Sequence, residues 1–257
     1  MSLKDRCALV TGAARGIGLV LARSLCERGV RVALNDVDPE GAARAAAELS
    51  SLGHRCLPCP GDVTRAADVA GMVERAEKEL GPLWLLVNNA GTFHSAPTVD
   101  FPEAAWDREF AVDVKAAFLC SQAALRSMIP RRAGRIVVVS SIAGWIVRTN
   151  QIAYCAAKAA AIHFARCLAV ETAPHGITVN CLCPGMTDSE MLRKSAGARG
   201  ATIADYEAMI PAGKLAKAED HASTILWLAS DEAAHVTGQV LSVDGGQSIY
   251  HPLTREG

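Results

Sequence analysis

The sequence predicts an α/β fold in which a parallel sheet is covered by helices on both faces, and three observations support this. Short apolar runs alternate along the chain with longer segments rich in Ala, Leu and Glu, which is the pattern of strand–helix–strand units. The chain has 257 residues, half of them hydrophobic and 21% charged, which is enough for a sizeable globular core. No repeat, low-complexity segment or linker interrupts it, so we expect a single domain over residues 1–257.

The expected elements follow from these runs in chain order. Strands are predicted at residues 8–10, 30–34, 55–59, 83–87, 135–139, 178–182 and 239–243. The clearest helices are predicted at residues 41–52, 66–80, 103–128 and 154–173. The least regular stretch, residues 187–216, is predicted to be a substrate loop.

Charge and composition exclude several classes of partner. The formal net charge of −1 gives no basic excess for nucleic acid or an anionic membrane. We find neither a signal-peptide pattern nor a run of about 18 uncharged apolar residues, so we expect a cytoplasmic protein. The nine cysteines are an odd number and are predicted to be reduced and buried. Cys56-Leu-Pro-Cys59 has metal-site spacing without a second pair, so no metal site is predicted.

A glycine-rich turn follows the first predicted strand. Residues 11–18 read Thr-Gly-Ala-Ala-Arg-Gly-Ile-Gly and precede a helical pattern. Glycines at such a turn let the backbone approach a pyrophosphate at a helix N-terminus. The predicted cofactor contacts of this turn are Gly12, Arg15, Gly16, Ile17 and Gly18.

Asp36 ends the second predicted strand, eighteen residues after Gly18. A carboxylate there can accept hydrogen bonds from the ribose hydroxyls of NAD and repels the 2′-phosphate of NADP. Arg15 has the opposite effect, because a guanidinium can pair with that phosphate. Because Arg15 can swing into solvent, Asp36 carries more weight and the sequence predicts NAD as the cofactor.

Two further segments are expected beside the cofactor. Asp62 and Val63 follow the third strand, where they could cap the next helix or touch the adenine. Residues 88–91 read Asn-Asn-Ala-Gly after the fourth strand, and Asn89, Ala90 and Gly91 suit a backbone lying close under the nicotinamide ribose.

Tyr154 and Lys158 lie four residues apart, so on a helix they share one face. A phenol with its ordinary pKa of ~10 is a poor acid or base at neutral pH. A neighbouring cation favours the phenolate and lowers that pKa, which makes the pair a proton-transfer device. Ser141 lies thirteen residues before Tyr154.

These motifs, in this order, resemble those of the short-chain dehydrogenase/reductase family over residues 4–246. The resemblance implies a Rossmann-like, doubly wound, seven-stranded parallel sheet in three layers. It also implies that Tyr154 is the general acid/base, that Ser141 rather than Ser140 binds the substrate oxygen, and that Lys158 holds the ribose hydroxyls. The matching segments are residues 11–18, 88–91, 184–185, 236–238 and 243–246, with Ser141, Tyr154 and Lys158.

The chain departs from this family pattern at two positions. The family usually has Asn where this chain has Asp113, and that Asn commonly supports a water that links the lysine to solvent. Asp113 has a similar size, so we expect it to preserve the relay with an altered pH profile. After Pro184 and Gly185, Ser189 stands where Thr is usual, and Thr187 is a second candidate contact with the cofactor.

The substrate is less well defined by the sequence. Ser141, Ala143, Trp145, Gln151, His94 and Met186 are predicted to line the pocket; Arg148 is expected to face solvent, and Asn150, Gly185 and Met191 are further candidates. The favoured function is NAD-linked hydride transfer on a secondary alcohol or ketone, with a sugar or polyol as one option. A 3-oxoacyl-[acyl-carrier-protein] reductase is an alternative, with Arg131, Arg132 and Arg135 docking the acidic carrier. A second alternative is a non-catalytic dinucleotide-binding regulator.

The alanine-rich helix 154–173 and the family resemblance suggest a homotetramer.

Overall fold

The computed structural model describes residues 3–189, 192–193, 196–197 and 200–250. Its centre is a seven-stranded sheet in the order β3-β2-β1-β4-β5-β6-β7, and every pairing is parallel. The predicted doubly wound parallel sheet is therefore confirmed. The strands are β1 (Cys7–Val10), β2 (Arg31–Leu34), β3 (Cys56–Pro58), β4 (Leu83–Asn88), β5 (Gly134–Val139), β6 (Ile177–Pro184) and β7 (Val240–Val243).

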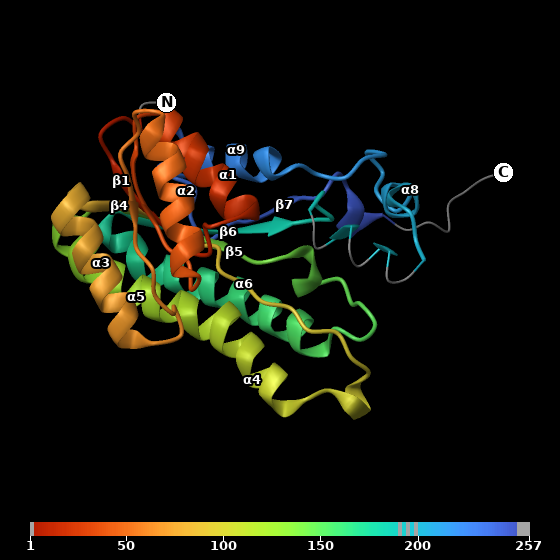
Figure 1. Ribbon diagram of the computed structural model, residues 1–257. Coiled ribbons are helices and arrows are strands. Elements are labelled where there is room, and N and C mark those ends of the chain that lie inside the picture. The colour runs from red at the N-terminus through yellow and green to blue at the C-terminus, as the bar shows by residue number, and fades with distance from the viewer. Residues whose placement is uncertain (1–2, 190–191, 194–195, 198–199, 251–257) are drawn as a thin grey trace.

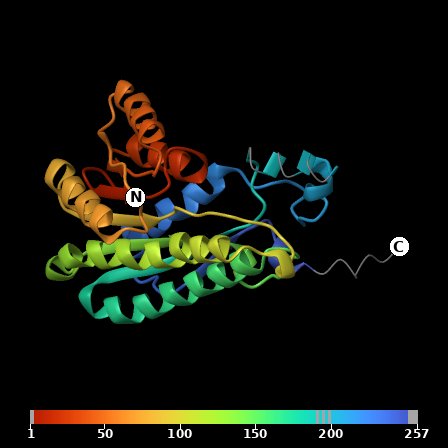
Figure 2. The ribbon, with the colours of Figure 1, turned by 60° about the horizontal axis from the view of Figure 1, so that its bottom comes forward.

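Helices cover both faces of the sheet and complete three layers (Figure 1). On one face lie α1 (Gly16–Glu27), α2 (Pro39–Ser51) and α9 (Ala218–Leu228). On the other lie α3 (Ala66–Leu80), α5 (Ala116–Arg131) and α6 (Ile152–Thr172), with α4 (Glu103–Phe110) leading into α5. Figure 2 shows α5 and α6 side by side along their length.

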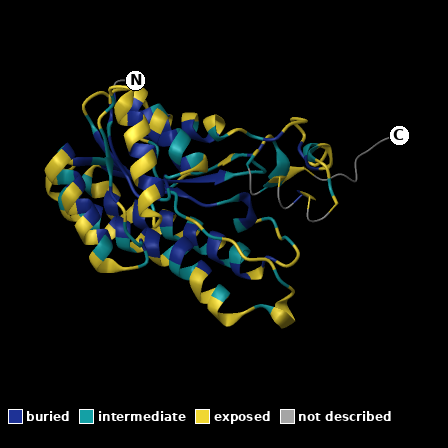
Figure 3. Ribbon diagram, viewed as in Figure 1, coloured by how far each residue is buried: buried dark blue, intermediate teal, exposed yellow. Residues whose placement is uncertain are grey.

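The core consists of two apolar clusters, one on each side of the sheet. Every residue of β1 and β5 is buried, as expected for parallel strands that are covered on both faces. Figure 3 shows this division, with dark blue strands between helices whose outer faces are exposed. The prediction of buried cysteines is wrong for Cys167, which is exposed on α6.

The helix predicted at residues 103–128 is divided in the structure. Between α4 and α5 the chain forms a π-helical segment, η2 (Ala111–Lys115), which carries Asp113. A π-turn contains an extra residue relative to an α-turn, and apolar periodicity does not signal that insertion. The segment turns Asp113 into the interior, where it is 4% exposed.

The predicted substrate loop leaves the sheet after β6. An isolated parallel bridge joins Thr187 to Ala216, so the two ends of this stretch lie side by side. Between them lies the short helix α8 (Ile203–Glu207). Met191, a candidate pocket residue, lies outside the described residues.

The segment Ile152–His175 is long and apolar enough to cross a membrane by length and composition alone. It comprises α6 and the short turn η4 (Ala173–His175). One face of α6 packs along β6 and the described core cluster on that side of the sheet, and 33% of the apolar window is buried.

Candidate active site

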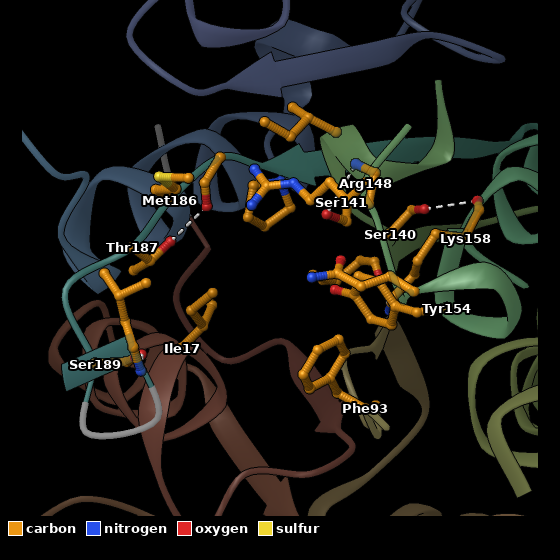
Figure 4. A pocket seen from close by; sticks show the side chains of 18 of the residues that line it. Ile17, Phe93, Ser140, Ser141, Arg148, Tyr154, Lys158, Met186, Thr187 and Ser189 are labelled. Carbon is orange, nitrogen blue, oxygen red and sulfur yellow. Dashed lines mark hydrogen bonds between the residues drawn. The ribbon is translucent and has the colours of Figure 1, made fainter. Parts of the chain in front are cut away.

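A cavity of about 380 Å³ opens at the carboxyl ends of the central strands. This is the edge at which α/β sheets bind ligands. Figure 4 shows Tyr154 and Ser141 on one side of it and Met186, Thr187 and Ser189 on the other. Of the predicted site residues, the described lining includes Ile17, Asn89, Gly91, Ser141, Ala143, Gln151, Tyr154, Lys158, Pro184, Gly185, Met186, Thr187 and Ser189.

The glycine-rich turn packs against the end of β4. Asn89 donates from its side-chain amide to the carbonyl oxygens of Thr11 (2.9 Å) and Gly12 (3.0 Å). A Cβ at Gly18 would lie 2.5 Å from the Gly12 oxygen and 2.6 Å from Asn89 Nδ2, so no side chain fits there. Helix α1 begins at Gly16 after Arg15, without a side-chain cap. The first-turn N–H groups therefore remain suited to an anion such as a diphosphate.

Asp36 is held in a fixed orientation beside this turn. Its Oδ2 accepts from the backbone N–H of Ala14 at 3.0 Å, and its Oδ1 accepts from that of Asp38 at 3.1 Å. The carboxylate is therefore oriented at the end of β2, where a dinucleotide fold places an adenosine ribose.

Asp62 and Val63 mainly organise the chain after β3. Asp62 Oδ1 accepts from both the backbone and the hydroxyl of Thr64, at 2.9 and 2.7 Å. Burial raises the pKa of Asp62, but these bonds and Arg108 outweigh it and leave the pKa lowered. Val63 is 7% exposed and belongs to the core, and neither residue is part of the described cavity lining.

Tyr154 and Ser141 face the cavity from neighbouring elements. Tyr154 lies in the first turn of α6, and the ring of Phe93 meets it edge-on with centroids 5.3 Å apart. Ser141 Oγ accepts from the backbone of Ala143 at 3.1 Å, which leaves its hydrogen available to a substrate oxygen. Ser140 instead donates to the Lys158 carbonyl at 2.8 Å and so joins the end of β5 to α6.

Lys158 forms a direct ion pair with Asp113. Its Nζ lies 2.9 Å from Asp113 Oδ1, and the two side chains are 6% and 0% exposed. Nζ also donates to the carbonyl of Val139 at 3.4 Å and lies 5.5 Å from the centroid of the Tyr154 ring. Burial lowers the pKa of Lys158, but Asp113 and then Tyr154 act in the opposite direction and leave that pKa raised. The ammonium is therefore retained at the tyrosine.

The ion pair lies directly beneath Gly91. A Cβ at Gly91 would lie 3.0 Å from Asp113 Oδ1 and 3.5 Å from Lys158 Nζ. Neither oxygen of Asp113 completes a hydrogen bond of regular geometry with a described residue. A second cavity of about 10 Å³, lined by Asp113, Asn88 and Thr11 among others, adjoins it. Such a space is close to the size of a single water.

The strand-end segment after β6 is held by a buried histidine. Thr187 Oγ1 donates to Gly185 O at 3.1 Å and lies 2.8 Å from Nε2 of His221 on α9. Because that hydroxyl already donates, we assign Nε2 as the donor to Thr187. Burial lowers the pKa of His221 to about 4, so it is neutral at pH 7. Ser189 lies further along and accepts from Leu192 N at 3.2 Å.

The predicted substrate residues divide into two groups. Ser141, Ala143, Gln151 and Met186 line the cavity. His94 instead packs edge-on against Phe101, and Trp145 is 43% exposed; neither belongs to the described lining. Arg148, expected to face solvent, lies in the lining instead (Figure 4). The sequence did not single out Thr92, Phe93, Leu192 and Tyr206, which also line the cavity and lie in loops or a short helix without a motif.

This geometry defines a class of protein. A phenol beside a buried ammonium lines the cavity, the glycine turn reaches it through Ile17, and the strand-end carboxylate of Asp36 is hydrogen-bonded to that turn at Ala14. Together they can bind a nicotinamide dinucleotide and exchange a proton with a substrate oxygen. The site is that of a nicotinamide-dependent oxidoreductase.

The comparisons with known proteins identify the family. The sequence profile described as enoyl-(acyl carrier protein) reductase matches residues 12–248. The chain is 43% identical to cis-4-hydroxycyclohexanecarboxylate dehydrogenase of Sinomonas cyclohexanicum, over 94% of this chain and 96% of that protein. It is 36% identical to a 3-oxoacyl-[acyl-carrier-protein] reductase of Salmonella typhimurium, over 96% and 98%.

A solved structure gives the same result. A gluconate 5-dehydrogenase from Burkholderia cenocepacia, in complex with NADP and tartrate, superposes with a TM-score of 0.91 at 32% identity, and 97% of each chain is covered. The chain therefore belongs to the short-chain dehydrogenase/reductase family.

Proposed function

We propose that this protein transfers a hydride between NAD(H) and a secondary alcohol or ketone that carries a carboxylate or a similar anion. The observation that carries the reaction class is the placement of Tyr154, Ser141 and Lys158 around one cavity. The anion is inferred from Arg148 and from the relatives. A sugar acid would combine this anion with the polyol that the polar pocket residues favour.

The chain's own residues supply the proton chemistry. Bound at this site, the nicotinamide would accept or donate the hydride. Ser141 donates a hydrogen bond to the substrate oxygen, while Tyr154 takes the hydroxyl proton in oxidation and returns it in reduction. Lys158, kept charged by Asp113, stabilises the phenolate form of Tyr154.

The proposed preference for NAD depends on Asp36. Two backbone N–H groups hold its carboxylate in place, so it cannot turn away from a 2′-phosphate without breaking both bonds. An ionised carboxylate beside that phosphate is repulsive. The gluconate 5-dehydrogenase in complex with NADP shows that the family also contains NADP-binding members.

The proposed substrate anion depends on the charge of the cavity. Arg148 belongs to its described lining, which contains no carboxylate, and a guanidinium can pair with an anionic ligand. One relative is a dehydrogenase of a hydroxycyclohexanecarboxylate, and one solved neighbour is a gluconate dehydrogenase with tartrate bound. Phe93, Leu192 and Tyr206 give the rest of the cavity an apolar and aromatic surface.

A paired substrate panel tests this function. We expect hydroxy acids to be oxidised with NAD at higher kcat/KM than the matching neutral alcohols, and Tyr154→Phe to lower kcat by about 10²–10⁴-fold. Arg148→Gln should lower kcat/KM for hydroxy acids by roughly 10–100-fold, the effect of one lost charge-assisted hydrogen bond. Exposed Arg126→Gln on α5 is the matched control. If Arg148→Gln lowered kcat/KM equally for neutral alcohols, the proposed role of the substrate anion would be wrong. A kcat/KM with NADP comparable to that with NAD would contradict the proposed preference for NAD.

The relative from Salmonella typhimurium keeps 3-oxoacyl-[acyl-carrier-protein] reduction as a second candidate. The residues expected to dock the carrier lie at the amino-terminal edge of the sheet, away from the cavity. Arg131 donates to the Leu83 carbonyl, and Arg135 is 5% exposed against Trp84. This placement favours the small hydroxy acid.

The alternative of a non-catalytic regulator is disfavoured because the acid/base residues are all in place. Dinucleotide binding without turnover on any substrate would favour the regulator instead.

A further inference from the structure

A second buried carboxylate lies beside the ion pair of Lys158 and Asp113. Glu109, in the last turn of α4, is 1% exposed. It lies four residues before Asp113, with the π-helical segment beginning between them. No family motif in this chain includes it, and the proton transfer described above does not require it.

The contacts of Glu109 satisfy only half of its carboxyl group. Oε1 accepts a short hydrogen bond from the backbone N–H of His94. Oε2 is buried and has no hydrogen-bond partner among the described residues. An ionised carboxylate buried with one oxygen unpaired carries a large desolvation cost, whereas a protonated carboxyl group does not.

The surrounding charges act on the pKa of Glu109 in both directions. The titratable groups that act on Glu109 are His94 from the loop after β4, Asp113 from η2 and Lys158 from α6, against which α4 packs. Burial, the largest cause, and the charge of Asp113 raise the pKa of Glu109, whereas the hydrogen bond from His94 and the charges of His94 and Lys158 lower it; the net effect is a raised pKa. Asp113 already neutralises Lys158 at 2.9 Å, so a charge on Glu109 would leave this buried cluster with a net −1.

We propose that Glu109 holds a proton at neutral pH and acts as a positioning residue for the site through Asp113. In this state the three side chains carry no net charge, and the full charge of Asp113 faces Lys158. Loss of the Glu109 proton adds a negative charge near Tyr154. That charge disfavours the phenolate and lowers the rate of alcohol oxidation.

Infrared spectroscopy on the full chain tests the protonation directly. The wild type at pH 7 should show the C=O stretching band of a protonated carboxyl group. Glu109→Gln should lack this band, and the exposed Glu103→Gln on the same helix should retain it. Raising the pH should abolish the band as Glu109 loses its proton. In Asp113→Asn the band should disappear at a lower pH than in the wild type, because the neighbouring negative charge is gone. The absence of any band lost in Glu109→Gln would overturn the proposal, and titration of the wild-type band does not depend on how a variant folds.

Kinetics test the coupling to the site. The pH profile of kcat for the wild type should change slope at the midpoint of the infrared band, and this feature should be missing from Glu109→Gln and present in Glu103→Gln. Identical wild-type and Glu109→Gln profiles would overturn the coupling. The coupling rests on the proposed function, but the infrared result needs no substrate. If no alcohol is oxidised, the infrared experiment therefore still decides whether Glu109 is protonated.

Discussion

The charge of Asp113 controls how Lys158 is held. A buried ion pair gives little net stability, because desolvation offsets the attraction, but removal of one partner leaves the other charge uncompensated. The direct 2.9 Å contact therefore raises the pKa of Lys158 and places a compensating negative charge beside its ammonium. The residue usual in the family, a neutral Asn, could not provide this.

Asp113→Asn is expected to change the pH dependence of the reaction. Without the carboxylate, the raised pKa of Lys158 falls and the site becomes more positive, so the phenolate of Tyr154 forms at lower pH. The acid limb of the kcat profile for oxidation should move to lower pH by roughly one unit, the effect of one nearby charge. Exposed Asp107→Asn on α4 is the control. Superimposable profiles of wild type and Asp113→Asn would refute the relay hypothesis.

Single residues differed in how well the sequence predicted their positions. Tyr154 and Lys158 could be placed together because helical spacing alone puts them on one face. His94 and Trp145 could not be excluded from the pocket, because the direction of a loop side chain depends on packing partners such as Phe101. Arg148 gave no periodic signal, and only the tertiary structure brings it to the cavity.

Helix α9 contacts the strand-end segment after β6 through one neutral histidine. His221 is fully buried, and its Nε2 contacts the hydroxyl of Thr187. Protonation would place an unpaired charge in the core, since Nδ1 has no hydrogen-bond partner among the described residues. The neutral imidazole therefore lets α9 hold the Thr187 hydroxyl without placing a charge in the core.

Acid should destabilise the protein through His221. Its pKa is about 4 when folded, against an ordinary 6.5, so on lowering the pH the unfolded chain takes up the proton first. The stability due to His221 is complete above about pH 6.5 and is lost as the pH falls towards 4, by up to about 3 kcal/mol. Denaturant unfolding across this range should show a shallower pH dependence for His221→Asn than for the wild type. Exposed His235→Asn should follow the wild type, and parallel curves for wild type and His221→Asn would exclude this role.

The sequence predicted the boundaries of those elements that have a distinct hydrophobic pattern closely. All seven predicted strands lie within two residues of the observed ones, because continuous apolar runs are required of buried parallel strands. The π-helical segment was not predictable, because α- and π-turns bury similar apolar faces and the pattern of residues 103–128 does not distinguish them.

Across the whole molecule, two helices carry apolar side chains that the chain itself leaves exposed. Phe118 on α5 is 46% exposed and Val170 on α6 is 77% exposed. α5 and α6 lie side by side (Figure 2), so these side chains can join one surface. We propose that this surface pairs with a second copy of the chain within a homotetramer.

Light scattering tests the assembly. The wild type should have the mass of a tetramer, and Val170→Lys or Phe118→Asp should lower that mass, because each places a charge in the proposed interface. Val99→Lys, at a position that is 90% exposed on η1 (Thr98–Asp100), is the matched control. A monomeric wild type would contradict the assembly while leaving the active-site proposals intact.

The close approach of Gly91 to the ion pair has an evolutionary consequence. A Cβ at position 91 would lie 3.0 Å from Asp113 Oδ1 and in ordinary contact with Lys158 Nζ, so a substitution there requires the Asp113 carboxylate to shift by a few tenths of an ångström. Positions 91 and 113 should therefore vary together among descendants of this chain. A lineage that gains an alanine at position 91 is expected to alter the side chain at position 113 or its contact with Lys158.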